Sequence, residues 1–141
     1  MRVTAYAARY DDIYPIEGAY FEAIAPGAFI GADFSRCVLL LDHNSALLLG
    51  RIGENLNVST DAIGLRFSCN LPETNLADDA SNLIKNGILT SCSWGFSIRA
   101  DEWSSSPSGV PFRLITAVQS VYDVSLVTYP ANRQARIISI K

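Results

Sequence analysis

The stretch ILTSCSWGFSIRA, residues 88–100, alternates small polar side chains with bulky apolar ones. Because successive side chains of a β-strand point to opposite faces, this period of two predicts a long strand with one packed face and one open face. The open face carries Ser91, Ser93, Gly95 and Ser97, and the packed face carries Cys92, Trp94, Phe96 and Ile98. Such a strand belongs in a sheet that covers a core, so we expect a fold built mainly from β-structure.

Further short strands are predicted on both sides of this stretch. Each is a run rich in β-branched, aromatic or alternating apolar residues, bounded by turn-forming residues. They are Val3–Tyr10, Glu17–Ile24, Cys37–Asp42, Ala46–Ile52, Leu56–Thr60, Ile63–Leu71, Phe112–Ala117 and Ser120–Tyr129. The serine-rich segment Ser104–Gly109 has the composition of a mobile hairpin loop.

One amphipathic helix is predicted from about Thr74 to Asn86. Apolar residues recur there on one face at helical spacing, Thr74 can cap the first turn, and Gly87 suits the exit. Many short strands with one helix predict a mainly β, α+β fold with a peripheral helix. We expect a closed or nearly closed antiparallel β-barrel, formed by a single domain over residues 1–141.

The bulk composition excludes several classes of protein. The chain has 141 residues, of which 49% are hydrophobic and 18% charged, as in a globular domain. Its apolar runs are far shorter than a membrane span, and its N-terminus lacks the continuous apolar segment of a secretory signal, so we expect a cytosolic protein without a membrane partner. The net charge of −3 gives no basic surface for nucleic acid.

The three cysteines, Cys37, Cys69 and Cys92, are odd in number and widely spaced. This pattern predicts reduced, mostly buried thiols rather than a disulfide framework. It also lacks the paired spacing of a zinc site, and the one histidine cannot complete such a site. We therefore expect neither a metal nor another cofactor.

His43 is the only histidine of the chain, and it follows the apolar run Val38–Leu41. Imidazole is the side chain whose ordinary pKa allows acid–base chemistry near neutral pH. A general base can activate a serine, and Ser93 offers a hydroxyl on a rigid strand. Gly95 leaves space on the same face for a substrate backbone, and Ser91 remains the alternative nucleophile.

A carboxylate is needed to hold the tautomer of the histidine. Asp42 is adjacent to His43, but neighbouring residues of a strand point to opposite faces, which makes it a poor partner. Asp123 lies in the apolar run Val121–Ser125, where a carboxylate needs a partner if it is buried. Asp123 is the better candidate, and an exposed acid on a strand remains the alternative.

Six segments of the chain match the pattern of a known family in the same order. They are Glu22–Phe29, Leu41–Asn44, Leu48–Arg51, Gly64–Phe67, Cys92–Phe96 and Tyr122–Ala131. From about Thr4 to Ala135, the chain resembles the prohead proteases of tailed bacteriophages. It departs from the commonest family pattern at Asn44, Cys92 and Ala117, where an acid, a methionine and a glutamate are usual.

The resemblance implies a serine endopeptidase that cleaves scaffolding protein, the propeptide of the major capsid protein and its own chain inside the procapsid, in the cytoplasm of the bacterial host. It implies a fold similar to that of the herpesvirus assemblins. The family's histidine falls on His43 and its serine on Ser93. Its third member falls on Asp123, where assemblins carry a second histidine.

The resemblance also suggests that backbone around Asn132 and Arg133 supplies the donors for the oxyanion. From the strand pattern, Ser91 and Gly95 share the face of Ser93 and are expected to face the substrate. The residues alone leave two other functions open. One is an inactive barrel of the same descent that binds scaffold as a structural module, and the other is a β-barrel that binds a small ligand. Whether the chain forms a homo-oligomer is also open.

Overall fold

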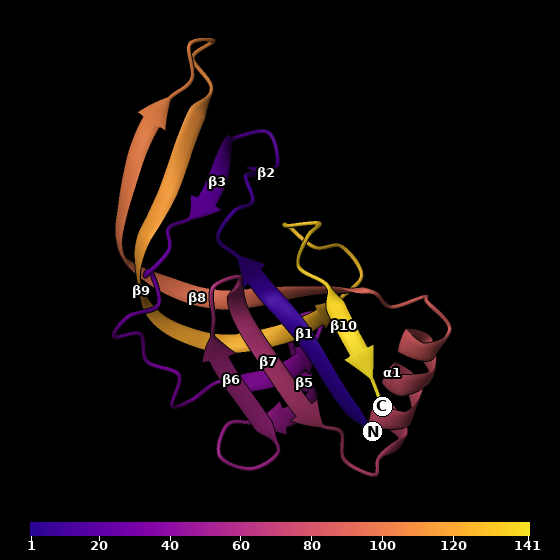
Figure 1. The fold of residues 1–141 in the computed structure, drawn as a ribbon. Coiled ribbons are helices and arrows are strands. Elements are labelled where there is room, and N and C mark those ends of the chain that lie inside the picture. Colours follow the sequence, from indigo (N-terminus) through magenta and orange to yellow (C-terminus); the bar gives the residue numbers. More distant parts are fainter.

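The computed structural model describes residues 1–141 as ten strands and one helix (Figure 1). The elements are β1 (Arg2–Arg9), β2 (Tyr14–Ile16), β3 (Tyr20–Ile24), β4 (Val38–Leu41), β5 (Asn44–Arg51), β6 (Leu56–Thr60), β7 (Gly64–Asn70), α1 (Asn75–Lys85), β8 (Ser91–Ser105), β9 (Pro111–Val127) and β10 (Ile137–Ile140). No helix has the length and apolar character needed to cross a membrane.

The strands form two sheets, and neither closes on itself. The smaller sheet has the order β10-β1-β7-β6, and in the larger one β2-β3-β9-β4-β5 are neighbours while β8 pairs with β9. The expected barrel is therefore not confirmed. The expectation of purely antiparallel pairing is wrong for two strands, since β3 and β4 both run parallel to β9.

The length of β9 explains this arrangement. The segments Phe112–Ala117 and Ser120–Tyr129, predicted as separate strands, form one continuous strand in the structure. Its first half pairs with β3 and its second half with β4 along the same edge, while β8 follows it along the other edge. The outer ends of β8 and β9 project from the body as a long hairpin (Figure 1).

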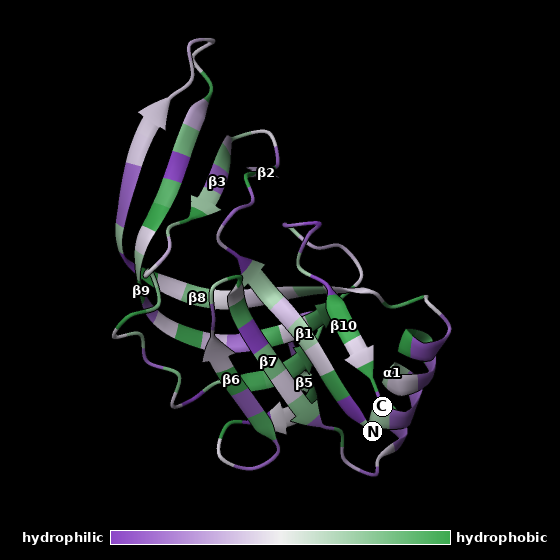
Figure 2. Ribbon diagram, viewed as in Figure 1, coloured by the Kyte–Doolittle hydropathy of each residue, from purple (hydrophilic) through white to green (hydrophobic).

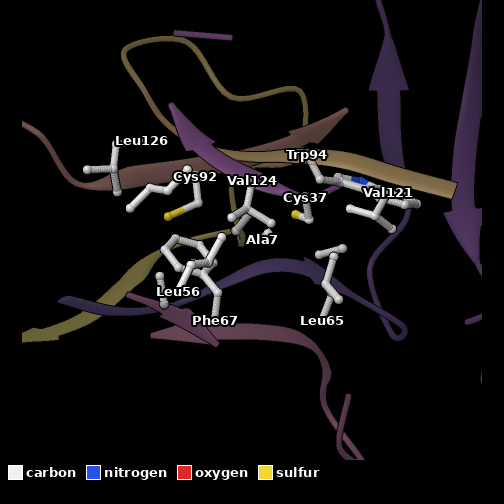
Figure 3. Packing of buried hydrophobic residues seen from close by; sticks show 14 of the residues in the cluster. Ala7, Cys37, Leu56, Leu65, Phe67, Cys92, Trp94, Val121, Val124 and Leu126 are labelled. Carbon is white, nitrogen blue, oxygen red and sulfur yellow. The ribbon is translucent and has the colours of Figure 1, made fainter. Parts of the chain in front are cut away.

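The core lies between the two sheets (Figure 3). Apolar side chains alternate with polar ones along the strands (Figure 2), so each sheet turns one apolar face inward. The smaller sheet contributes Ala7, Leu56, Leu65 and Phe67, and the facing layer contributes Cys37, Cys92, Trp94, Val121, Val124 and Leu126.

The three cysteines are buried free thiols, as the sequence predicts. Burial raises the pKa of Cys69 to about 11 and that of Cys37 to about 12, so both stay protonated near neutral pH. Burial also raises the pKa of Cys92, whose side chain lies in the core. The thiols therefore serve packing rather than nucleophilic chemistry.

The predicted alternation along β8 is confirmed in its first half. Cys92 and Trp94 are buried, whereas Ser91, Ser93 and Gly95 are partly exposed on the other face. Beyond Gly95 the register with β9 shifts several times, so the strict alternation ends there.

The predicted helix is confirmed to within one residue at each end. Thr74 caps it by accepting a hydrogen bond from the Ala77 N–H at 3.1 Å. Other boundaries differ from the prediction. Only Tyr20–Ile24 of the predicted strand Glu17–Ile24 is a strand, β3, and it pairs with β2, which was not predicted. β8 extends to Ser105 into the predicted loop, and β10 was not predicted.

Candidate active site

His43 lies in a two-residue turn between β4 and β5. Asp42 and His43 both have positive φ, 50° and 57°, and Leu41 pairs with Asn44 across the turn. Tight hairpins use this left-handed conformation because it matches the twist of the paired strands. The turn therefore begins one residue earlier than the sequence indicates, and it holds the backbone of His43 in a fixed position.

The second half of β9 anchors this turn. The Thr128 N–H donates to Oδ1 of Asp42 at 2.9 Å, and the Asp42 N–H donates to the Leu126 carbonyl at 2.9 Å. As expected, Asp42 is not the partner of the His43 ring. Its carboxylate instead ties the turn to the end of β9.

The imidazole of His43 contacts Asp123. The distance between Nδ1 of His43 and Oδ2 of Asp123 is 2.7 Å, with the histidine side chain 41% exposed and the aspartate 13% exposed. The hydrogen bond to this carboxylate raises the pKa of His43 above its ordinary value, and partial burial opposes that shift. The arrangement leaves Nε2 as the ring nitrogen that is not engaged by the carboxylate.

Gly95 makes room for the Asp123 carboxylate. The two residues are cross-strand partners of β8 and β9, and a Cβ atom on Gly95 would overlap Oδ1 of Asp123. The space that the sequence suggests for a substrate backbone is thus occupied by the side chain of the candidate acid.

Substituting Gly95 by alanine is expected to displace Asp123 and break its contact with His43. Because His43 is the only histidine, its ring gives a single NMR titration curve, and the pKa read from that curve should fall in Gly95→Ala toward the ordinary value. The control is Ser97→Ala, which alters the same strand two residues away and should leave the curve unchanged. An unchanged curve in Gly95→Ala would contradict the role given to the glycine.

Ser93 lies on the same face of β8 as Gly95, two residues before it in the strand. It is opposite Ser125, and the next pair on that face is Gly95 with Asp123. The alternative nucleophile Ser91 is opposite Val127, which places it one pair further from the carboxylate. No hydrogen bond joins the Ser93 hydroxyl to the His43 ring in this structure.

Ser125 is a residue of this cluster that sequence reasoning missed. It is fully buried, its hydroxyl donates to Oδ2 of Asp123 at 2.7 Å, and its Oγ accepts from the His43 backbone N–H at 3.2 Å. One hydroxyl therefore links the carboxylate to the turn that carries the imidazole. The available signal was its spacing, because Ser125 follows Asp123 by two residues and so shares its face of the strand.

The two residues suggested as oxyanion donors lie in different surroundings. Asn132 is buried and lines the same pocket as Ser93, and its Nδ2 makes no hydrogen bond within the chain. Arg133 is exposed and does not line this pocket, although its carbonyl accepts from Arg136 Nε at 3.1 Å. No group of three or more His, Cys, Asp or Glu side chains gathers as a metal site.

Comparison with known proteins supports the resemblance seen in the sequence. The family described as caudovirus prohead serine protease matches residues 1–141. A relative named prohead protease, from Enterobacteria phage HK97, is 28% identical over 124 residues, which cover 85% of this chain and 53% of that protein. The chain thus spans about half the length of this relative. No solved structure matches the chain, and the expected relation to herpesvirus assemblins stays a prediction.

Proposed function

Because the chain belongs to the caudovirus prohead serine protease family, we propose that it is a serine endopeptidase that acts in the maturation of the phage procapsid. The observation that carries this proposal is the 2.7 Å contact between His43 and Asp123. Asp123 belongs to the cross-strand pair that follows the Ser93–Ser125 pair on the same face of the sheet. An imidazole oriented by a carboxylate next to a strand serine is the arrangement that activates a hydroxyl for attack on an amide.

In the proposed mechanism the Ser93 hydroxyl attacks the peptide carbonyl while Nε2 of His43 takes its proton. Asp123 holds the proton on Nδ1 and stabilises the imidazolium that forms. The imidazolium then protonates the leaving amine, and water releases the acyl group from Ser93 by the same steps. Contact between Ser93 and His43 would form when substrate binds, since catalytic hydrogen bonds often tighten only in the complex.

Two further residues support this mechanism. Ser125 shares Oδ2 of Asp123 with the histidine and also accepts from the His43 backbone, so we assign it the role of holding the acid and the base in register. The side-chain amide of Asn132, which lies beside the Asp12 carboxylate, is a candidate donor for the oxyanion, because Asn132 lines a pocket that Ser93 also lines.

The proposed substrates are the scaffolding protein, the propeptide of the major capsid protein and the chain itself. Enclosure within a procapsid, in the cytoplasm of the host, would place enzyme and substrates at high local concentration. Weak recognition of extended peptide can then suffice.

Labelling with a serine-directed fluorophosphonate tests the proposal. We expect one covalent adduct, located on Ser93 by mass spectrometry of the digested protein, because only an activated hydroxyl reacts at a useful rate. Ser93→Ala should not be labelled. A chain that stays unlabelled while correctly folded would instead be the inactive structural module of the same family.

The pH dependence of cleavage should report the titration of His43. The base must be neutral, so kcat/KM is expected to rise with pH, with a midpoint above the ordinary value of 6.5 because the Asp123 contact raises this pKa. Activity would therefore be lost as pH falls through the raised pKa. A rate that stays constant between about pH 5 and 8 would contradict the role of His43 as the base.

A further inference from the structure

The edge of β8 that faces away from β9 is paired only at its beginning. The Cys92 N–H donates to the Ala135 carbonyl at 2.8 Å, and the Ile137 N–H donates to the Thr90 carbonyl at 3.0 Å. The backbone N–H of Cys92 therefore points away from β9, and every second residue of β8 points its backbone groups the same way. Trp94 is the next residue in that series, so its N–H and C=O also point away from β9.

Nothing in the chain pairs with this edge at Trp94. The segment that pairs with Cys92 turns away at Ala135, whose N–H donates to the Asn132 carbonyl at 3.1 Å within a tight turn. Outside the ladder with β9, no backbone hydrogen bond includes Trp94. An unpaired edge of this kind accepts an extended peptide as an added strand, and it lies next to Ser93.

A pocket of about 190 Å³ lies beside the open edge. The stacked rings of Trp94 and Phe96, 3.6 Å apart, form part of its wall, and Ser93 contributes to its lining. The β2–β3 hairpin supplies Tyr14 and Glu22. The volume is below the roughly 300–1,000 Å³ of sites for small molecules and fits a single side chain.

Glu22 gives this pocket a chemical preference. Its side chain is only 5% exposed, Oε1 accepts from the Tyr14 hydroxyl at 2.8 Å, and Oε2 has only Arg113 Nη1 at 3.5 Å. The closer partner of Arg113 is Asp101, at 2.7 Å from Nε. A buried carboxylate oxygen with one long contact retains capacity to accept a hydrogen bond, so an incoming N–H donor would be stabilised there.

We propose that the open edge of β8 binds substrate as an extended strand, and that the adjoining pocket takes one substrate side chain ending in an N–H donor, held by Glu22. This inference rests on the proposed protease function. The bound substrate strand would continue along β8 the pairing that residues 135–137 begin, so the substrate backbone would pass Ser93. Lysine and arginine offer a charged donor, and glutamine and asparagine a neutral one.

A binding experiment on the Ser93→Ala variant tests the inference without turnover. The probes are four peptides, acetyl-Thr-Val-X-Thr-Val-Thr-amide, in which X is lysine, glutamine, leucine or glutamate. Titration followed by amide NMR should shift the backbone resonance of Trp94. Lysine and glutamine peptides should bind about tenfold more tightly than the leucine and glutamate peptides, the ratio expected for one hydrogen bond to a charged group.

Two controls separate the pocket from the edge. Glu22→Gln, added to the same variant, should reduce the affinity for the lysine peptide about tenfold, because the charge is lost while the shape is kept. Methylating the backbone nitrogens of the lysine peptide should abolish the Trp94 shift in the chain with Glu22 intact, which keeps the test valid even if Glu22→Gln does not fold.

Equal affinities for the four peptides, or shifts that map away from β8, would overturn the inference. So would the absence of any shift at millimolar peptide. The cleavage assay on the unmodified chain is separate. If the chain cleaves scaffold but binds the four peptides without preference, the proposed protease function stands and the proposed subsite is wrong. If the chain binds the peptides selectively but does not cleave, the subsite stands and the proposed protease function is wrong.

Discussion

Ser93→Ala is expected to lower kcat/KM for cleavage of scaffolding protein by about 10⁴-fold or more, because it removes the hydroxyl proposed to form the acyl intermediate. The assay is cleavage of purified scaffold followed by gel electrophoresis and mass spectrometry. The folded chain should be unaffected, since Ser93 is only partly buried and its side chain forms no hydrogen bond in the structure.

Ser91→Ala is the matched control for this substitution. Ser91 lies on the same strand and the same face, but it is opposite Val127 rather than near Asp123. Its loss should change kcat/KM less than about tenfold. If Ser91→Ala abolished cleavage while Ser93→Ala cut scaffold at an undiminished rate, Ser91 would be the nucleophile.

His43→Asn should also reduce kcat/KM by about 10⁴-fold, since the chain has no other imidazole to accept the proton. Asparagine is chosen because it tolerates the positive φ of 57° at this position, so the turn between β4 and β5 is retained. Circular dichroism and the melting temperature should therefore match those of the unmodified chain.

The double variant Ser93→Ala with His43→Asn provides the internal check. Residues that act as one catalytic unit are far from additive, so the double variant should be no slower than either single variant. Losses that multiply would mean that the two side chains act independently, and the proposed proton transfer between them would be wrong.

Much of this chain could be predicted from local patterns. Period-two alternation located β8, helical spacing and the Thr74 cap located α1, and the six family segments pointed to His43, Ser93 and Asp123. These signals act within one strand or one turn of helix, where the direction of each side chain follows from its neighbours in sequence. The structure brings His43 and Asp123 together.

The sequence by itself determined the helix, most of the strands and the identity of the candidate acid and base, but it missed β10 and divided β9 in two. The tertiary structure decided how they meet. The parallel pairing of β4 with β9 places the His43 turn beside Asp123. The pairing of β8 with β9 puts the Asp123 carboxylate where a side chain at Gly95 would otherwise lie. It also revealed Ser125 as the link between them. The physical reason is that strand order, direction and register depend on contacts between distant segments, which no local pattern encodes.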